Sequence, residues 1–402
     1  MPLRTARLAL AIAGAFAAQA SASISDDVIR IGLITDMSGV YSDLGGPAGA
    51  EAVRMAIADA GGEINGKKIE LLVADHQNKA DIAAARARSW FDEQNLDMLI
   101  GGTNSSAILA MAAVAAEKKR PFMVAGAGTS ALTNSHCTPY TVHYSYNTVA
   151  LSRGTGKAVV EQGGDTWFFL TADYAFGHAL EADASKFLQD AGGKVLGSVR
   201  APLSSTDYAS YMLQAQSSGA KILGLAVSGG DLINAVKAAR DFGVTQTMTM
   251  AGLLPTINDI HALGLEVTQG MYLTSPWYWN QDADARAWGL QFYEKVGRMP
   301  SFVQGADYAV ASLYLRGVQE TGTDDPDAFM KWVKSAKIND MYTKKGYVRE
   351  DGRVIRDMLL AQIKAPGEST EPWDYYKIVS VLPGEEVFGP IEESTCKLLK
   401  QG

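Results

Sequence analysis

The stretch Leu99–Thr133, LIGGTNSSAILAMAAVAAEKKRPFMVAGAGTSALT, decides the fold, because its pattern predicts a strand, a turn, a helix, a second strand and a second turn. The first strand ends in two glycines, and apolar residues then recur at helical spacing from Ile108 to Ala115. The second strand, 122–125, runs into the small-residue turn Gly126–Ser130. Adjacent parallel strands present such turns at their carboxyl ends, where open α/β sheets bind ligands. Glycines also serve ordinary tight turns, but two hydroxyl-rich turns in succession favour a binding crevice.

The same alternation extends to both sides of this stretch. Before it, strands are predicted at 28–35 and 69–74, each followed by an amphipathic helix. After it the pattern begins again, with a helix at 152–162 and strands at 166–171, 195–200, 222–227 and 248–252. Asp-Ala-Gly-Gly at 59–62 recurs at 190–193 in the same context. The order is typical of an α/β protein with two doubly wound, Rossmann-like lobes.

Further elements follow the second lobe. A strand at 271–275, helices at 284–296, 304–321 and 326–336, and a hairpin within 346–364 are predicted. Helices after the second sheet need a surface to pack on, so we expect the chain to cross between the lobes several times and to form a hinge. The predicted division is 26–147 plus 277–345 for lobe 1, 148–276 plus 346–384 for lobe 2, and 385–402 for a C-terminal tail.

Residues 1–22 have the pattern of a signal peptide. Arg4 and Arg7 precede an apolar run from Leu8 to Ala18, and Ala20-Ser21-Ala22 suits cleavage. The run is shorter than the roughly 20 residues that a membrane span needs. We therefore expect the mature protein to be exported from the cytoplasm. The formal net charge of −8 opposes a nucleic-acid partner.

The chain has two cysteines, Cys137 and Cys396, far apart in sequence. In an oxidising compartment a single bridge that ties the C-terminal tail to the body is favoured over two free buried thiols. Neither cysteine has a Cys or His at the spacing of a zinc site, so no metal is expected.

Enzyme motifs are missing from the sequence. There is no G-x-G-x-x-G at the start of the first helix, no Walker A sequence and no G-x-S-x-G. His76, beside Asp75, is a candidate acid–base group, but a hydrogen-bonded turn histidine is the simpler interpretation. Asp36, Asp75 and Asp173 follow strands and are interpreted as caps and turn formers. We expect neither catalysis nor a cofactor.

Seven segments together resemble one known family: IRIGLITDMSGVYSDLGGPAGAEAVRMA, VADHQNKAD, VAGAGTSALT, GGDTWFFLTADYAFGHALE, LQAQSSGAKILGLAVSGGDLINAVKAA, GRMPSFVQ and PWDYYKIVSVLPG. The chain is similar, over nearly all of its mature length, to periplasmic solute-binding proteins of branched-chain amino acid ABC importers. The resemblance implies the type I periplasmic binding protein fold, with three crossovers between the lobes. It also implies a small-molecule ligand, a membrane permease as partner and a monomeric protein.

The resemblance assigns ligand contacts to the turns that follow the strands. In lobe 1, neutral donors at helix N-termini would hold a carboxylate without a buried counter-charge. The predicted ligand-binding residues are Tyr41, Asn104, Ser105, Ala127, Gly128, Thr129, Tyr174, Ser228, Gly229, Leu253 and Trp277.

One turn departs from the family's pattern. Amino-acid binders place an acid after a late strand of the second lobe to pair with the ligand's ammonium group, whereas 250–255 here reads Met-Ala-Gly-Leu-Leu-Pro. Leu253 therefore argues against an α-amino acid, unless Asp231 or Asp259 supplies the charge. Trp277, followed by Tyr278 and Trp279, offers aromatic surface for a flat ligand, although such residues also pack lobe interfaces.

We therefore expect a small carboxylate with an uncharged tail, and an aromatic acid in preference to an amino acid. Two alternatives stay open: a branched-chain amino acid or amide binding protein, and a ligand sensor for a separate signalling partner.

Overall fold

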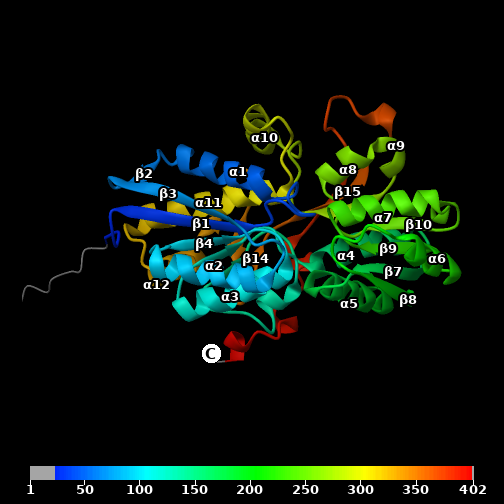
Figure 1. The fold of residues 1–402 in the computed structure, drawn as a ribbon, viewed down its shortest axis with the longest axis horizontal. Coiled ribbons are helices and arrows are strands. Elements are labelled where there is room, and N and C mark those ends of the chain that lie inside the picture. Colours follow the sequence, from blue (N-terminus) through cyan, green and yellow to red (C-terminus); the bar gives the residue numbers. More distant parts are fainter. Residues whose placement is uncertain (1–22, 401–402) are drawn as a thin grey trace, which may run out of the picture.

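A computed structural model describes residues 23–400, so the predicted signal peptide 1–22 lies outside the described residues. The chain folds into two α/β lobes that lie side by side (Figure 1). Lobe 1 contains the N-terminal strands together with the helices α10 to α12, and lobe 2 contains the middle of the chain. The predicted two-lobe α/β class is confirmed.

Lobe 1 is built on a six-stranded sheet. The edge strand β2 pairs antiparallel with β3, and all the other neighbouring strands pair in parallel. In the central strand β1, Ile29, Ile31 and Leu33 on one face and Ile34 on the other have no exposed surface, so both faces are covered. The strands, in spatial order, are β2 (Glu63–Ile64), β3 (Lys67–Asp75), β1 (Val28–Thr35), β4 (Met98–Gly101), β5 (Phe122–Val124) and β6 (Thr141–His143).

Six helices belong to lobe 1, and three of them come from the region after the second sheet. The α1 helix packs along α11 and α2 packs along α3, so each face of the sheet is covered. The helices are α1 (Gly46–Asp59), α2 (Ala80–Glu93), α3 (Ser105–Lys118), α10 (Ala283–Val296), α11 (Phe302–Thr321) and α12 (Pro326–Ser335). The prediction that the late helices return to the first lobe is consistent with these contacts.

Lobe 2 repeats the strand order of lobe 1 around its own first strand. The parallel sheet runs β10 (Thr249–Gly252), β9 (Ile222–Ala226), β7 (Thr166–Ala172) and β8 (Lys194–Ala201). The helices are α4 (Thr148–Glu161), α5 (Ala175–Asp190), α6 (Ala209–Ser217), α7 (Gly230–Asp241), α8 (Ile257–Leu263) and α9 (Leu265–Thr268). In lobe 1, β1 lies between β3 and β4, and in lobe 2, β7 lies between β8 and β9; each arrangement makes a topological switch point.

The α4 helix begins four residues before the predicted start at 152. The side chain of Asn147 accepts a hydrogen bond from the backbone N–H of Ala150 at 2.9 Å and so caps the helix. The preceding strand, β6, spans Thr141–His143.

Antiparallel strands complete both lobes. A three-stranded sheet of β11 (Tyr272–Ser275), β15 (Met358–Ile363) and β16 (Tyr376–Leu382) lies beside α4. A smaller sheet contains β12 (Lys337–Ile338), β13 (Gly346–Val348) and β14 (Val354–Ile355). The short helices are α13 (Gly384–Val387) and the 3-10 turns η1 (Ser130–Thr133), η2 (Val244–Gln246), η3 (Pro366–Glu368), η4 (Ile391–Glu393) and η5 (Lys397–Lys400).

The β13–β14 hairpin contacts lobe 1, not lobe 2. The N–H of His143 in β6 donates to the carbonyl of Gly352 at 2.8 Å, and His143 bridges in parallel to Arg353. The division predicted from the sequence assigned 346–384 to lobe 2, and from these contacts we propose that the hairpin belongs to lobe 1. We propose that the chain crosses between the lobes at 144–147, 276–279 and 356–357.

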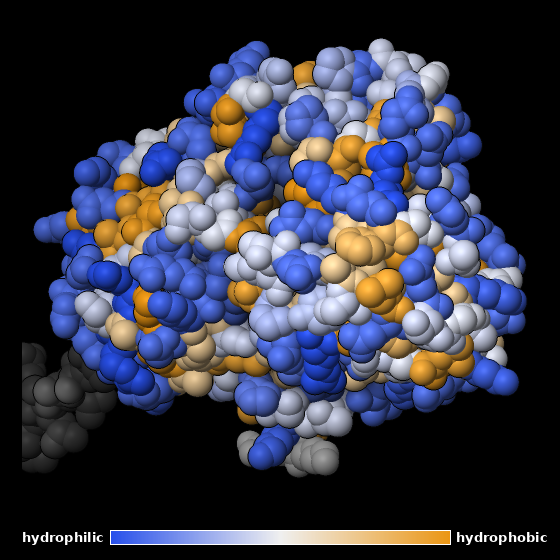
Figure 2. Space-filling view, turned by 45° about the vertical axis from the view of Figure 1, so that its right-hand side comes forward, coloured by the Kyte–Doolittle hydropathy of each residue, from blue (hydrophilic) through white to orange (hydrophobic). Residues whose placement is uncertain are grey.

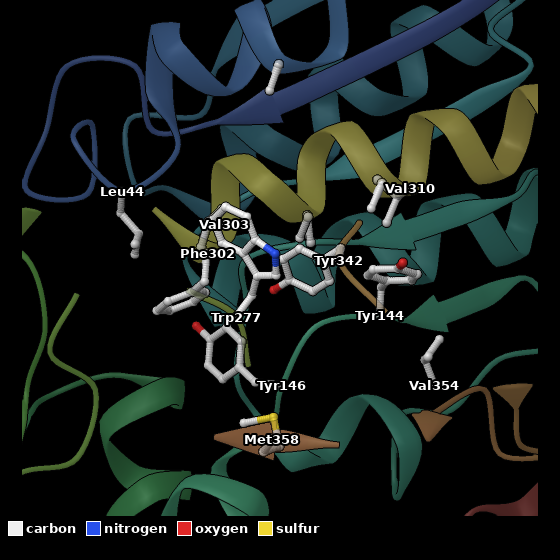
Figure 3. Packing of buried hydrophobic residues seen from close by; sticks show 14 of the residues in the cluster. Leu44, Tyr144, Tyr146, Trp277, Phe302, Val303, Val310, Tyr342, Val354 and Met358 are labelled. Carbon is white, nitrogen blue, oxygen red and sulfur yellow. The ribbon is translucent and has the colours of Figure 1, made fainter. Parts of the chain in front are cut away.

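Buried aromatic residues fill the region of these crossings (Figure 3). The ring of Trp277 stacks on Tyr342 at 5.8 Å and meets Trp288 edge-on at 5.7 Å. The buried guanidinium of Arg353 donates to the carbonyls of Tyr144 and Tyr146 at 2.7 and 2.9 Å. The first and third crossings are thereby fixed to each other.

The predicted disulfide is confirmed: Cys137 and Cys396 are bonded. Cys137 lies between η1 and β6 of lobe 1, and Cys396 lies near the C-terminal end of the described residues. The bridge therefore ties the tail to lobe 1.

The surface is mixed in character. On the face in Figure 2, polar residues predominate and hydrophobic residues form separate patches. Within residues 23–400, none of the helices combines the length and the apolar composition that crossing a bilayer requires.

Asp97 makes the stability of lobe 1 depend on pH. Its carboxylate accepts the N–H of Arg30 at 2.7 Å, but burial raises the pKa of Asp97 to about 7. Because the folded pKa lies above the unfolded one, the folded state binds the proton more tightly, and stability falls as the pH rises from about 4 to 7. In Asp97→Asn an amide oxygen still accepts from Arg30 and no proton is exchanged. We expect the unfolding midpoint of this variant, measured with denaturant from pH 4 to 8, to fall less steeply than that of the wild type.

A matched control is Asp241→Asn, because Asp241 is exposed at the end of α7. The unfolding midpoint of Asp241→Asn should fall with rising pH as steeply as that of the wild type. Parallel curves for wild type and Asp97→Asn would contradict this role of Asp97.

Candidate functional site

A small cavity lies between the lobes, at the carboxyl ends of both sheets. Lobe 1 contributes the turns after β1, β4 and β5, and lobe 2 contributes the turns after β7, β9 and β10. This is the place where the switch points of two doubly wound sheets face each other. The lining residues are Tyr41, Leu44, Thr103, Asn104, Ser105, Gly126, Ala127, Gly128, Tyr146, Tyr174, Phe176, Ser228 and Leu254.

The turn between β4 and α3 supplies hydrogen-bond donors to this cavity. Asn104 has a positive φ of 68°, and its side chain caps α3 by accepting from the N–H of Ala107 at 3.0 Å. The Ser105 hydroxyl accepts the N–H of Thr129 at 3.3 Å, which leaves its own proton free to donate. Within residues 23–400, the backbone N–H groups of Asn104, Ala127 and Gly128 have no hydrogen-bond acceptor. This end of the cavity is suited to an anion.

The loop between β1 and α1 presents Tyr41 to the cavity. The buried carboxylate of Asp36 accepts the N–H groups of Gly39 and Tyr41 at 2.6 and 2.9 Å, and the Asn78 side-chain amide at 2.6 Å. The interpretation of Asp36 as a turn former is confirmed, and its effect is to fix Tyr41.

Three hydrogen bonds join this loop to lobe 2. The hydroxyls of Tyr41 and Tyr174 are 2.7 Å apart, and the N–H of Gly230 donates to the carbonyl of Val40 at 3.1 Å. The side-chain amide of Asn258 donates to the carbonyl of Asp43 at 2.8 Å. The lobes are therefore in a closed arrangement.

Gly229 permits this close approach. Its φ is +60°, and a Cβ at this position would lie 2.4 Å from the carbonyl oxygen of Val40. A side chain here would hold the lobes apart. Gly229, predicted as a ligand contact, thus acts between the lobes and does not line the cavity.

Four aromatic rings contribute to the cavity lining. Tyr41, Tyr174 and Phe176 form a row with ring centroids 6.4 and 6.1 Å apart, and Tyr146 packs edge-on against Phe302 at 5.2 Å. Burial raises the pKa of Tyr41 and Tyr146 well above the usual value for tyrosine. Both phenols are consequently neutral at physiological pH and can donate hydrogen bonds.

The cavity has no charged lining residue among residues 23–400. Asp231 accepts from the N–H of Ser204 and the hydroxyl of Tyr208, both at 3.1 Å, and Asp259 belongs to the capping box of α8 with Thr256. Both acids are buried, and neither is among the residues that line the cavity.

The predicted site residues divide into two groups. Seven line the cavity: Tyr41, Asn104, Ser105, Ala127, Gly128, Tyr174 and Ser228. Four do not: Thr129, Gly229, Leu253 and Trp277. Thr129 is buried at the start of η1, and Trp277 is buried in the aromatic cluster of the crossings (Figure 3). Leu253 has no exposed surface, and its neighbour Leu254 faces the cavity instead.

Sequence reasoning missed six lining residues: Leu44, Thr103, Gly126, Tyr146, Phe176 and Leu254. Thr103, Gly126, Phe176 and Leu254 are each next to or two residues from a predicted contact, so an extension of each turn would have found them. Tyr146 lies in the first crossing, and its hydroxyl donates to the carbonyl of Gly126 at 2.9 Å. Only the return of the chain between the lobes brings Tyr146 to the cavity.

His76 is part of the support of this site. Its Nε2 is 2.9 Å from the carbonyl of Thr103, and its Nδ1 accepts the N–H of Asn78 at 3.0 Å. Burial lowers the pKa of His76, so the ring is neutral at physiological pH. Nε2 thus contacts the β4–α3 turn and Nδ1 contacts the loop after β3, so His76 is a hydrogen-bonded turn histidine, as the simpler interpretation expected.

The fold and the cavity define a two-lobed binding protein. A sequence model described as "Periplasmic binding protein" matches residues 28–369, so the chain belongs to this family. It is 57% identical to a periplasmic binding protein from Burkholderia mallei, with a TM-score of 0.91 over 92% of this chain and 99% of that one. The family and this relative are binding proteins and not enzymes.

Three other likenesses extend the comparison. A protein from Burkholderia xenovorans, described as a branched chain amino acid ABC transporter periplasmic ligand-binding protein, is 35% identical, with a TM-score of 0.82 over 92% of this chain and 99% of that one. A solute binding protein of an ABC transporter from Rhodopseudomonas palustris, in complex with p-hydroxybenzoic acid, is 23% identical, with a TM-score of 0.81 over 91% and 100%, and shows the fold alone. The curated Leu/Ile/Val-binding protein homolog 6 of Brucella melitensis is 25% identical over 264 residues. The chain spans 66% of that relative's length, slightly less than two thirds.

Gly128 offers a direct test of the cavity. A Cβ at this position would lie 2.8 Å from Tyr146 and 3.2 Å from Phe176 of lobe 2. Overpacking at such a contact costs about 1–3 kcal/mol, which is about a tenfold loss of affinity or more. We expect Gly128→Ala to weaken ligand binding by this factor in calorimetry and to change the melting temperature of the ligand-free protein little.

The exposed Gly367→Ala is the control, because a Cβ there meets no atom within 4 Å. Equal affinities for the two variants would show that the ligand binds elsewhere.

Proposed function

We propose that this chain is the extracytoplasmic solute-binding component of an ABC importer, and that its lobes close around a small aromatic monocarboxylate. The ligand carboxylate lies against the neutral donors of lobe 1, and its ring lies among the tyrosines and Phe176. The protein makes and breaks no bond. It acts as a monomer and presents the closed form to a membrane permease.

The observation that carries this proposal is the uncharged lining of the cavity. An α-amino acid brings an ammonium group, and a buried cation without a paired charge is costly. Leu254 occupies the turn where amino-acid binders of this family carry an acid. A carboxylate needs no buried cation here, because free backbone N–H groups and the Ser105 hydroxyl can hold it.

The aromatic lining of the cavity supports a flat ligand. Tyrosine and phenylalanine rings provide stacking and edge contacts for an aromatic ring. The structure in complex with p-hydroxybenzoic acid illustrates that this fold accommodates such an acid.

A branched-chain amino acid is the second candidate, because the 35% identical relative from Burkholderia xenovorans carries that description. In either case the ligand shifts the lobes toward the closed form by its additional affinity for that form.

A ligand panel separates these candidates. Binding to the native state alone raises the melting temperature, so benzoate and 4-hydroxybenzoate should raise it, whereas leucine, valine and isoleucinamide should not. Thermal unfolding is measured with each compound at the same concentration, and hits are confirmed by calorimetry. A shift with leucine or valine and none with the aromatic acids would overturn the proposed ligand class.

Leu254 tests the electrostatic argument. In Leu254→Asp a carboxylate faces the ligand's own carboxylate in a closed cavity, and like charges at such distances cost several kcal/mol. We expect the affinity for the aromatic acid to fall by about a hundredfold or more. Leu254→Met keeps the volume and the neutral lining, so its affinity should stay within about tenfold of wild type. If Leu254→Asp binds the acid as tightly as Leu254→Met, the ligand does not occupy this cavity.

A further inference from the structure

The C-terminal segment Pro383–Cys396, which we call the strap, contacts both lobes. It follows β16 of lobe 2 and ends at the disulfide to Cys137 of lobe 1. It is therefore a fourth covalent connection between the lobes, in addition to the three crossings of the main chain. We propose that the disulfide-anchored strap holds the two lobes in their closed orientation and so sets the balance between the open and closed forms.

The first part of the strap contacts lobe 2, the third crossing and the β13–β14 hairpin. Helix α13 packs against α4, and the N–H of Gly384 donates to the carboxylate of Asp357 in the third crossing at 3.1 Å. The hydroxyl of Tyr347 in β13 donates to the Glu385 carboxylate of α13 at 2.7 Å. Arg153, on α4, donates to the carbonyl of Glu386 at 2.9 Å.

The second part of the strap is attached to lobe 1. Arg349, next to the β13–β14 turn, donates to the carbonyl of Gly389 at 2.7 Å, and the Arg353 guanidinium lies 4.4 Å from the centre of the Phe388 ring. Further along, the hydroxyl of Ser394 donates to the carbonyl of Thr133 at 2.8 Å. The N–H of Thr395 donates to the side chain of Asn134 at 2.9 Å.

One ion pair crosses from lobe 2 to the part of the strap that lobe 1 holds. Arg153 of α4 is 2.7 Å from the carboxylate of Glu393, which lies only three residues before Cys396. Gly389 makes room for this arginine, because a Cβ there would lie 2.5 Å from its guanidinium. The pair is partly exposed, so by itself it contributes little to the stability of the closed orientation.

The disulfide makes these weak contacts effective. The chain between Glu386 and Gly389 can extend by only about 3.5 Å per residue. A change in the orientation of the lobes must therefore strain or break the hydrogen bond at Glu386 or the one at Gly389. A free chain end would fray after such a hydrogen bond breaks. The covalent bond to Cys137 keeps the strap end close to Thr133 and Asn134, where the hydrogen bonds form again at high effective concentration.

The test measures the lobe orientation without requiring the identity of the ligand. Small-angle X-ray scattering gives the radius of gyration of the ligand-free full-length protein, oxidised and after treatment with a phosphine reductant. In that treatment the S–S bond becomes two thiols while the phosphine takes up the oxygen of one water. We expect the reduced protein to have a larger radius of gyration, with unchanged far-ultraviolet circular dichroism.

A pair of variants tests the strap with the disulfide intact. Glu393→Gln removes the ion pair with Arg153, and the matched control Glu392→Gln removes the same charge from the neighbouring exposed residue. We expect Glu393→Gln to increase the radius of gyration and to weaken the affinity for whichever panel compound binds by about two- to fivefold. Added salt should reduce the difference between Glu393→Gln and wild type, because exposed ion pairs are screened.

The outcomes separate this proposal from the proposed ligand. An unchanged radius of gyration in both the reduced protein and Glu393→Gln would overturn the strap proposal, whatever the ligand is. If reduction unfolds the protein, the radii of gyration of Glu393→Gln and Glu392→Gln are compared instead, and equal values would overturn the strap proposal. If no aromatic acid binds, the ligand class is wrong and the scattering result still tests the strap.

Discussion

The hydrogen bond between the hydroxyls of Tyr41 and Tyr174 joins the carboxyl edges of the two sheets, and the cavity is enclosed only while these edges meet. Its geometry depends on Asp36, whose carboxylate fixes the loop that carries Tyr41. It depends equally on Gly229, which lets the backbones of the two lobes approach. The closed form is thus built from short-range contacts that a small rotation of the lobes would break.

Charge is kept away from the cavity although the chain buries several ionisable groups. Arg353 is satisfied by backbone carbonyls at the first crossing, and Asp231 and Asp259 are satisfied within lobe 2. A binding site of neutral dipoles selects for the charge of its ligand, because dipoles at helix N-termini stabilise an anion but give a cation no partner. The proposed ligand class therefore depends on the lack of a charged lining residue, among residues 23–400, as much as on the neutral donors and aromatic rings that line the cavity.

The architecture was predictable because it depends on periodicity. Buried strands such as β1 and amphipathic helices such as α1 leave patterns that survive in any sequence of this fold. The turns after these strands could be located, and with them most of the lining. The position of a single side chain within a turn could not: Leu253 points into the core and Leu254 into the cavity, because one residue reverses the side-chain direction at the end of β10.

By itself the sequence determined the two α/β lobes, the hydroxyl-rich turns after β4 and β5, and the absence of an acid from the turn after β10. These are local properties, set by residue type and spacing. Only the tertiary structure decided that Tyr146 reaches the cavity and that Trp277 does not, and that the β13–β14 hairpin lies against lobe 1. It also decided that the tail connects both lobes. Each of these depends on contacts between residues far apart in the chain, which the packing of the whole molecule selects and no local pattern records.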